Sequence, residues 1–156
     1  YTPASQFMTE AKNDVAKDAI YYGCDGLDGI DTAVKGFDIS TIPQEVSFLS
    51  HFNSKSTEGA SGEFIKKYTE KFGADSLSQF GAAAYDCVYA IYGAMKEAGD
   101  KISVTSSPSD ICNALKDVFN GGYTYSGVTG TNIKWTAEGF VSKTALKYIV
   151  KESDAK

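Results

Sequence analysis

The side chains best suited to binding chemistry lie in a turn rich in glycine and aspartate at residues 23–29. An apolar run at 19–22 precedes it and predicts a short buried strand. Asp25 follows the carboxyl end of this strand, where open α/β sheets bind ligands, and glycines on both sides let backbone approach a ligand closely. A carboxylate there could bind a cation such as an ammonium group. The alternative is that Asp25 and Asp28 only shape the turn and cap the next helix.

Catalytic chemistry finds little support in the sequence. The single histidine, His51, could act as a general base, but a base needs a placed partner, and no nucleophile motif accompanies it. The chain has no phosphate-binding loop, no dinucleotide-binding glycine fingerprint and no nucleophile elbow. We therefore expect a protein that is not an enzyme and uses no cofactor or metal. An α/β hydrolase that uses His51 and a carboxylate is the enzymatic alternative.

The three cysteines, Cys24, Cys87 and Cys112, do not form a metal-binding or disulfide pattern. No two of them have Cys-x-x-Cys spacing, and a zinc site would have to recruit carboxylates. Free cysteine is among the most frequently buried residue types. We therefore expect three thiols that are buried or half-buried.

The composition is that of an ordinary globular chain with more acidic than basic residues. Its 156 residues are enough for one domain with a core, and 42% hydrophobic residues is a usual content. The formal net charge of -5 disfavours binding to nucleic acid or to an anionic membrane surface. No apolar run is long enough to cross a bilayer, and no secretory signal is present. Because the chain begins with Tyr1 and not with methionine, we expect a processed protein or a piece of a longer one.

Hydrophobic periodicity predicts a mixture of helices and strands, as in an α/β fold. Helices are expected over residues 4–17, 28–35, 61–72, 77–97 and 107–120. Strands are expected over residues 19–22, 46–52, 131–135 and 143–151, with a turn at 136–139 between the last two. The run at 46–52 is apolar enough for a strand that is buried on both faces, as parallel strands are.

The predicted helix at 77–97 is apolar around most of its circumference. Between its start and Lys96 it carries a single charge, Asp86. A helix of this kind must be covered on most of its sides. We therefore expect other elements to pack around it.

The order of these segments resembles the type I periplasmic binding proteins of the branched-chain amino-acid class. Five segments occur in the order of that family and together span nearly the whole chain. They are the strand and turn through 29, the strand ending in Ser-His-Phe at 50–52, the helical segments 64–73 and 80–86, and the C-terminal residues 127–135 with 148–151.

The resemblance implies an α/β fold, a parallel-sheet sandwich of the type I periplasmic-binding-protein class that is incomplete and has a C-terminal β-hairpin. Members of this family have two lobes that close on a ligand, and this chain matches only their last part. Residues 1–52 would form part of the C-terminal lobe, 53–120 helices that normally pack on the N-terminal lobe, and 121–156 the crossover and hairpin. The chain is therefore expected to be a C-terminal fragment.

The same resemblance implies ligand-binding roles for three residues. In this family the acidic residue at the position of Asp25 holds the α-ammonium group of the ligand. Phe80 matches an apolar wall against the ligand's side chain, and Tyr1 lies beside an aromatic position that contacts the ligand. Many relatives have tryptophan where this chain has Leu27, so the pocket is expected to differ in shape.

The implied function is that of an extracytoplasmic solute-binding component of an ABC transporter that takes up amino acids, with branched-chain amino acids as expected ligands. Its partners would be the amino-acid ligand and a membrane ABC permease, with no nucleic acid. The expected location is the periplasm, or the surface of a Gram-positive cell as a lipoprotein. The alternative is a ligand-sensing extracellular receptor domain of the same fold.

A fragment that lacks its opposing lobe is expected to bind ligand weakly or not at all. It would also expose apolar faces of the helix at 77–97, and burial of such surface is worth roughly 25 cal/mol per Å². We therefore expect the chain to self-associate, to swap segments with a second copy, or to pack against a retained N-terminal piece.

Overall fold

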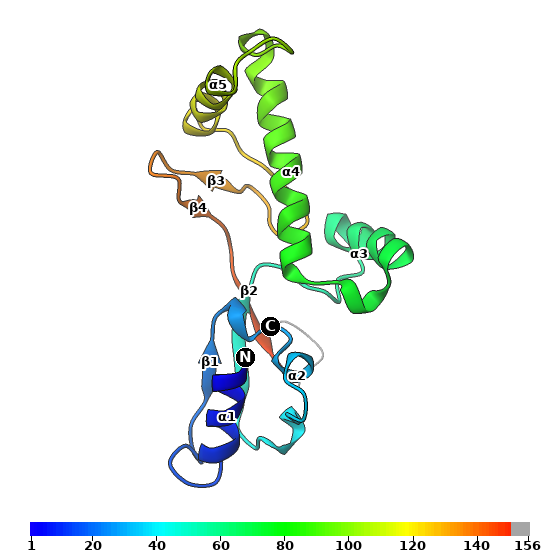
Figure 1. Cartoon of the computed structure of the whole chain (residues 1–156), viewed down its shortest axis with the longest axis vertical. Coiled ribbons are helices and arrows are strands. Elements are labelled where there is room, and N and C mark those ends of the chain that lie inside the picture. Colours follow the sequence, from blue (N-terminus) through cyan, green and yellow to red (C-terminus); the bar gives the residue numbers. More distant parts are fainter. Residues whose placement is uncertain (151–156) are drawn as a thin grey trace. The chain divides into compact units, whose positions relative to one another are not determined.

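The computed structural model describes residues 1–150, apart from the side chains of Asp31 and Thr32. The chain divides into two compact units, whose helices and strands are shown in Figure 1. Unit 1 comprises residues 1–50 and the segment that begins at Ala145, and unit 2 comprises residues 51–144.

Unit 1 is built around a small mixed sheet whose central strand is β2. Its elements are α1 (Thr2–Ala11), β1 (Tyr21–Gly23), η1 (Asp25–Leu27), α2 (Ile30–Ala33), η2 (Ile39–Thr41), β2 (Val46–Ser50) and β5 (Leu146–Ile149). β1 pairs with β2 in parallel, and β5 pairs with it antiparallel. All residues of β2 except Leu49 are buried, which agrees with the predicted coverage of both faces.

The apolar core of unit 1 takes side chains from α1, β1, α2 and β2. A buried amide fixes the chain next to this core: Gln44 Nε2 donates to the carbonyl oxygens of Lys12 and Ala16, at 2.7 and 2.9 Å. These carbonyls lie in the turn that follows α1, and the helix ends at Ala11, so the predicted extension to residue 17 is wrong. Val15, which lies inside the predicted helix at 4–17, is 81% exposed in this turn.

The strand β5 pairs with β2, and this differs from the sequence prediction. Phe48 stacks on Tyr148 with ring centroids 5.5 Å apart, and Lys147 Nζ lies 2.6 Å from Glu45 Oε1. The predicted pairing of this segment with 131–135 is therefore wrong. The C-terminal hairpin does form, but it joins β3 (Lys134–Trp135) to β4 (Val141–Ser142), because its tight turn pairs only the residues next to it.

Unit 2 is arranged along the long helix α4 (Figure 1). Its other elements are α3 (Gly59–Phe72), η3 (Ala74–Ser76), η4 (Gly99–Lys101), α5 (Pro108–Asn120), β3 and β4, and α4 itself spans Gln79–Ala98. α3 packs against the N-terminal half of α4 through a cluster of Phe52, Phe64, Ala82 and Val128. α5 packs against the C-terminal half through Ala94, Ala98, Ala114 and Val118.

Capping residues explain why these helices begin and end close to the predicted positions. The hydroxyl oxygens of Ser78 and Ser107 accept a backbone N–H of the first turn of α4 and α5, in each case at 3.2 Å. Gly73 and Gly99 follow α3 and α4 with φ of 83° and 55°, which favour glycine. The predicted helices at 61–72 and 77–97 are thus confirmed to within two residues at each end.

Asp86, the one charged residue in the apolar part of α4, is buried and joins this helix to the segment 125–130. Its carboxylate accepts hydrogen bonds from the backbone N–H groups of Val128 and Thr129, at 2.9 and 2.8 Å. The hydroxyl groups of Thr129 and Tyr125 also donate to it. Burial and then the charge of Asp86 raise the pKa of Tyr125 above its ordinary value. Asp86 therefore fixes the C-terminal segment against the middle of α4.

One expectation about burial is wrong. The three cysteines are exposed, because Cys24 lies in the acidic turn while Cys87 and Cys112 lie on outward faces of α4 and α5. The helix α4 is covered by α3 and α5 on only part of its circumference, which agrees with the expectation that a fragment exposes apolar faces of this helix. Its exposed large apolar side chains are Phe80, Tyr85, Val88, Tyr89, Ile91, Tyr92 and Met95.

Asp86→Ala is expected to lower the free energy of unfolding of unit 2 by about 3 kcal/mol, because each buried donor left without an acceptor costs about 1–3 kcal/mol. Thr129→Val removes one hydroxyl and keeps the carboxylate, so it should cost about 1 kcal/mol. The fluorescence of Trp135, which packs against Phe119 at 4.7 Å between ring centroids, follows urea unfolding of this unit. Equal losses in the two variants would contradict the role given to Asp86.

Candidate functional site

The acidic turn forms directly after β1, as the sequence predicts. Leu27 N donates to Cys24 O and Asp28 N donates to Asp25 O, both at 3.0 Å, which gives one turn of 3₁₀-helix. A Cβ at Gly23 would lie 2.5 Å from Leu27 Cδ1, so a larger residue here would require the Leu27 side chain to move. The parallel pairing of β1 with β2 therefore places Asp25 just beyond the carboxyl end of a sheet strand.

A cavity of about 610 Å³ lies in unit 1 between the start of α1, the strand β1 and the acidic turn. Its lining residues are Tyr1, Pro3, Ala4, Met8, Ile20, Tyr21, Tyr22, Gly23, Cys24, Gly26 and Leu27. Asp25 is not one of them, but both of its chain neighbours are, and Asp25 itself is exposed. The structure thus brings Tyr1 and the turn that carries Asp25 to one cavity.

Tyr21 is a lining residue that sequence reasoning missed. Its side chain is 8% exposed and its ring meets Phe7 edge-on, with centroids 6.1 Å apart. Its hydroxyl is buried and makes no hydrogen bond with the described residues. Because this hydroxyl is buried, a ligand in the cavity does not reach it unless the surrounding residues move. A tyrosine in an apolar strand carries no sequence signal that separates a place in the wall of a cavity from core packing.

Phe80, the third predicted site residue, belongs to unit 2. It is the second residue of α4 and is 56% exposed. The cap from Ser78 fixes the helical turn that carries it. Phe80 therefore presents an aromatic surface in a different unit from Tyr1 and Asp25.

His51 has a structural partner. Its Nδ1 lies 3.0 Å from the backbone carbonyl oxygen of Thr144, and since a carbonyl can only accept, Nδ1 carries the proton. Within the described part of the chain, no group of three or more His, Cys, Asp or Glu side chains could hold a metal ion. His51 therefore ties together the two ends of unit 2.

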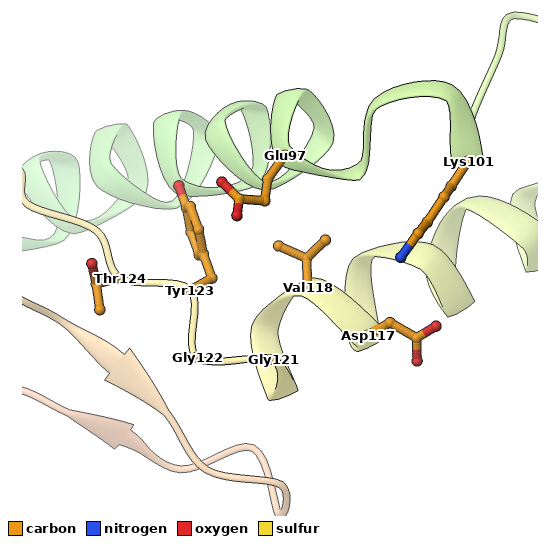
Figure 2. A pocket seen from close by; sticks show the side chains of 8 residues that line it. All are labelled: Glu97, Lys101, Asp117, Val118, Gly121, Gly122, Tyr123 and Thr124. Atoms are coloured by element: carbon orange, nitrogen blue, oxygen red, sulfur yellow. The ribbon is translucent and has the colours of Figure 1, made fainter.

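A second cavity, of about 420 Å³, lies in unit 2 beside the C-terminal ends of α4 and α5. Figure 2 shows Glu97, Lys101 and Val118 pointing into the space between these two segments. Burial and then the charge of Glu97 raise the pKa of Tyr123, which also lines the cavity. The carboxylates of Glu97 and Asp117 outnumber the single ammonium group, so the cavity disfavours anions. None of the predicted site residues lies there.

Two solved structures share the fold of this chain. One is a candidate branched-chain amino acid ABC transporter from Rhodospirillum rubrum, with 22% sequence identity and a TM-score of 0.62. The other is a leucine-binding protein from Thermotoga maritima, with 18% identity and a TM-score of 0.68. Each comparison covers 100% of this chain and 41% of the other protein. No protein-family model matches the sequence, and neither does any curated protein.

This likeness establishes the fold. The chain is a mixed α/β structure that matches a part of the type I periplasmic-binding-protein fold, and it spans less than half the length of either neighbour. Neither neighbour is described as an enzyme, which agrees with the expectation of a non-enzymatic chain. Among residues 1–150, no helix combines the length and the apolarity needed to cross a bilayer.

Tyr21→Phe is expected to leave the free energy of unfolding of the unliganded chain unchanged or to raise it by about 1 kcal/mol, because it removes a buried hydroxyl with no protein partner. Tyr125→Phe is the matched control. Its hydroxyl donates to Asp86 at 3.1 Å, so this change should lower the free energy of unfolding by about 1 kcal/mol. Urea unfolding followed by circular dichroism measures both. A loss of stability in Tyr21→Phe as large as in the control would contradict the assignment.

Proposed function

We propose that this chain is part of an extracytoplasmic solute-binding protein that captures an amino acid and delivers it to an ABC permease. The observation that carries the proposal is the cavity of unit 1, which ends at an acidic turn beyond the carboxyl end of β1. Ligands of open α/β sheets bind at such places. The fold shared with a leucine-binding protein supports the same reading.

The proposed roles follow from the chemistry of an α-amino acid. Asp25 pairs with the α-ammonium group in a charge-assisted hydrogen bond, which is stronger than a neutral one. Tyr1 provides an aromatic wall. Phe80, at the start of α4, is the proposed apolar wall against the ligand's side chain.

Branched-chain amino acids are the proposed ligands because much of the cavity wall is aliphatic. Ala4, Met8, Ile20 and Leu27 contribute this surface. Pockets for small molecules typically combine an apolar lining with a few polar groups that fix orientation. A leucine, isoleucine or valine side chain would lie against the aliphatic wall while its ammonium group meets the acidic turn.

The proposed partner is a membrane ABC permease, and the proposed location is the periplasm or the surface of a Gram-positive cell as a lipoprotein. No chemical step takes place in this function. Closure of the two lobes of the whole binding protein around the ligand signals to the permease that ligand is bound. The net charge of -5 disfavours nucleic acid as a partner.

Leucine, isoleucine or valine at about ten times its Kd should stabilise the native chain by roughly 1.4 kcal/mol, which raises Tm by about 3–5 °C. Asp25→Asn should abolish this shift, because it keeps the size of the side chain and removes the charge that pairs with the ammonium group. Differential scanning calorimetry with and without each amino acid measures the effect.

Two controls separate recognition of the ammonium group by Asp25 from effects of any charge change in the turn or of the rest of the ligand. Asp28→Asn changes a carboxylate of the same turn and should keep the shift in Tm. The α-hydroxy acid analogue of leucine lacks the ammonium group and should give no shift with the unaltered chain. An equal shift with leucine in Asp25→Asn would overturn the role proposed for Asp25.

A further inference from the structure

The acidic turn carries an apolar side chain that folds back over the end of β1. Tyr21 and Gly23 lie on the same face of this strand, because successive side chains of a strand point to opposite faces. Outside the adjoining residues, a Cβ at Gly23 would have atoms of Leu27 as its nearest neighbours, Cδ1 at 2.5 Å, Cγ at 2.9 Å and Cβ at 3.9 Å. Leu27 therefore occupies the space that a side chain at position 23 would take.

The Leu27 side chain lies between the core of unit 1 and the cavity. It is half-buried and packs against the core cluster that includes Met8, Tyr21 and Ile30. It also lines the cavity, together with Gly23. All of these contacts are made within unit 1, so further residues of a longer protein would add neighbours to Leu27 without removing those it has. Leu27 is thus a wall of the cavity whose position is fixed by the core behind it.

We propose that Leu27, held over Gly23, sets the size of the ligand side chain that the cavity accepts and favours aliphatic over aromatic amino acids. This inference rests on the proposed function, in which Asp25 binds the ammonium group. Asp25 and Leu27 begin and end the same turn of 3₁₀-helix. The α-carbon of an amino acid carries both the ammonium group and the side chain, so a ligand bound at this turn has its side chain close to Leu27.

Substitutions at Leu27 and at Gly23 are expected to change the cavity in opposite directions. Leu27→Ala removes the isopropyl group and enlarges the cavity. Gly23→Ala places a methyl group where the Leu27 side chain now lies, so that side chain must move. Met8 and Tyr21, which are 3% and 8% exposed, fill the core side and leave the cavity as the direction of this movement. Gly23→Ala therefore makes the cavity smaller.

Titration of the ¹⁵N-labelled chain with leucine and with phenylalanine at millimolar concentrations, followed at the backbone amides of residues 22–28, measures the preference. The unaltered chain should bind leucine more tightly. Leu27→Ala should shift the ratio of the two Kd values about tenfold or more toward phenylalanine, since one methylene group in an apolar pocket is worth about 10–200-fold. Leu27→Val removes less of the side chain and should give a smaller shift in the same direction. Gly23→Ala should weaken the binding of leucine about tenfold.

The variant that combines both changes tests whether Gly23 acts through Leu27. When Leu27→Ala is present, a methyl group at position 23 has no nearer neighbour than the Cβ of residue 27 at 3.9 Å, an ordinary van der Waals distance. Adding Gly23→Ala to Leu27→Ala should therefore cost little leucine affinity, and the two changes should also be non-additive in urea unfolding without ligand. Gly26→Ala is the matched control, since its Cβ would lie 3.8 Å from Cys24 Sγ, and its effect should add to that of Leu27→Ala.

The outcomes separate this inference from the proposed function. The inference would be overturned by additive effects of Gly23→Ala and Leu27→Ala in unfolding, or by a ratio of Kd values that Leu27→Ala leaves unchanged. Tighter binding of phenylalanine by the unaltered chain, or no binding of either amino acid in any variant, would also overturn it. The proposed function fails on a different result, which is binding of leucine that is equally strong in Asp25→Asn.

Discussion

The pairing of β2 on both of its edges is the constraint on which unit 1 and its candidate site depend. β2 holds β1 in a parallel register in which Gly23 lies opposite Phe48, and this fixes where the acidic turn begins. On the other edge, β5 returns from a distant part of the sequence and stacks Tyr148 on Phe48. Without β2, neither the turn that carries Asp25 nor the cavity beside it would have a fixed wall.

Unit 2 shows how one helix can serve two purposes. The buried side of α4 is made largely of alanine, which lets α5 approach closely. On the same side, Asp86 holds the segment 125–130 by a set of hydrogen bonds. The exposed side carries aromatic and aliphatic residues that the other elements of the unit cover only in part. The same sequence feature, an apolar helix with one charge, therefore yields both an internal anchor and an external surface.

The sequence predicted the helices well because their signals are local. Serine caps begin α4 and α5, glycines follow α3, α4 and α5, and a 3.6-residue period runs through each helix, so the bounds of these helices could be predicted from nearby residues. The partner strand of β5 could not be predicted from the sequence, because strand pairing depends on which edge of the sheet is still unpaired in the folded chain. The end of α1 was missed for a similar reason, since it depends on Gln44, a residue far along the chain.

The candidate site was predictable in part. A glycine-rich acidic turn after an apolar run indicated the position of Asp25, and the structure adds the cavity and the buried hydroxyl of Tyr21. The lack of a hydrogen-bond partner for this hydroxyl could not be predicted, because a tyrosine with a partner in the core would have the same sequence pattern. The exposure of the cysteines was likewise invisible, since it depends on which side of each helix is left uncovered.

The most direct test of the proposed function is a ¹H–¹⁵N correlation spectrum of the chain titrated with leucine. Glycine amides are well separated in such spectra, and this chain has glycines in both cavities. The proposed function predicts saturable shifts at Gly23 and Gly26, which line the cavity of unit 1, with no change at Gly121 and Gly122 of the unit 2 cavity. Shifts confined to Gly121 and Gly122 would contradict it.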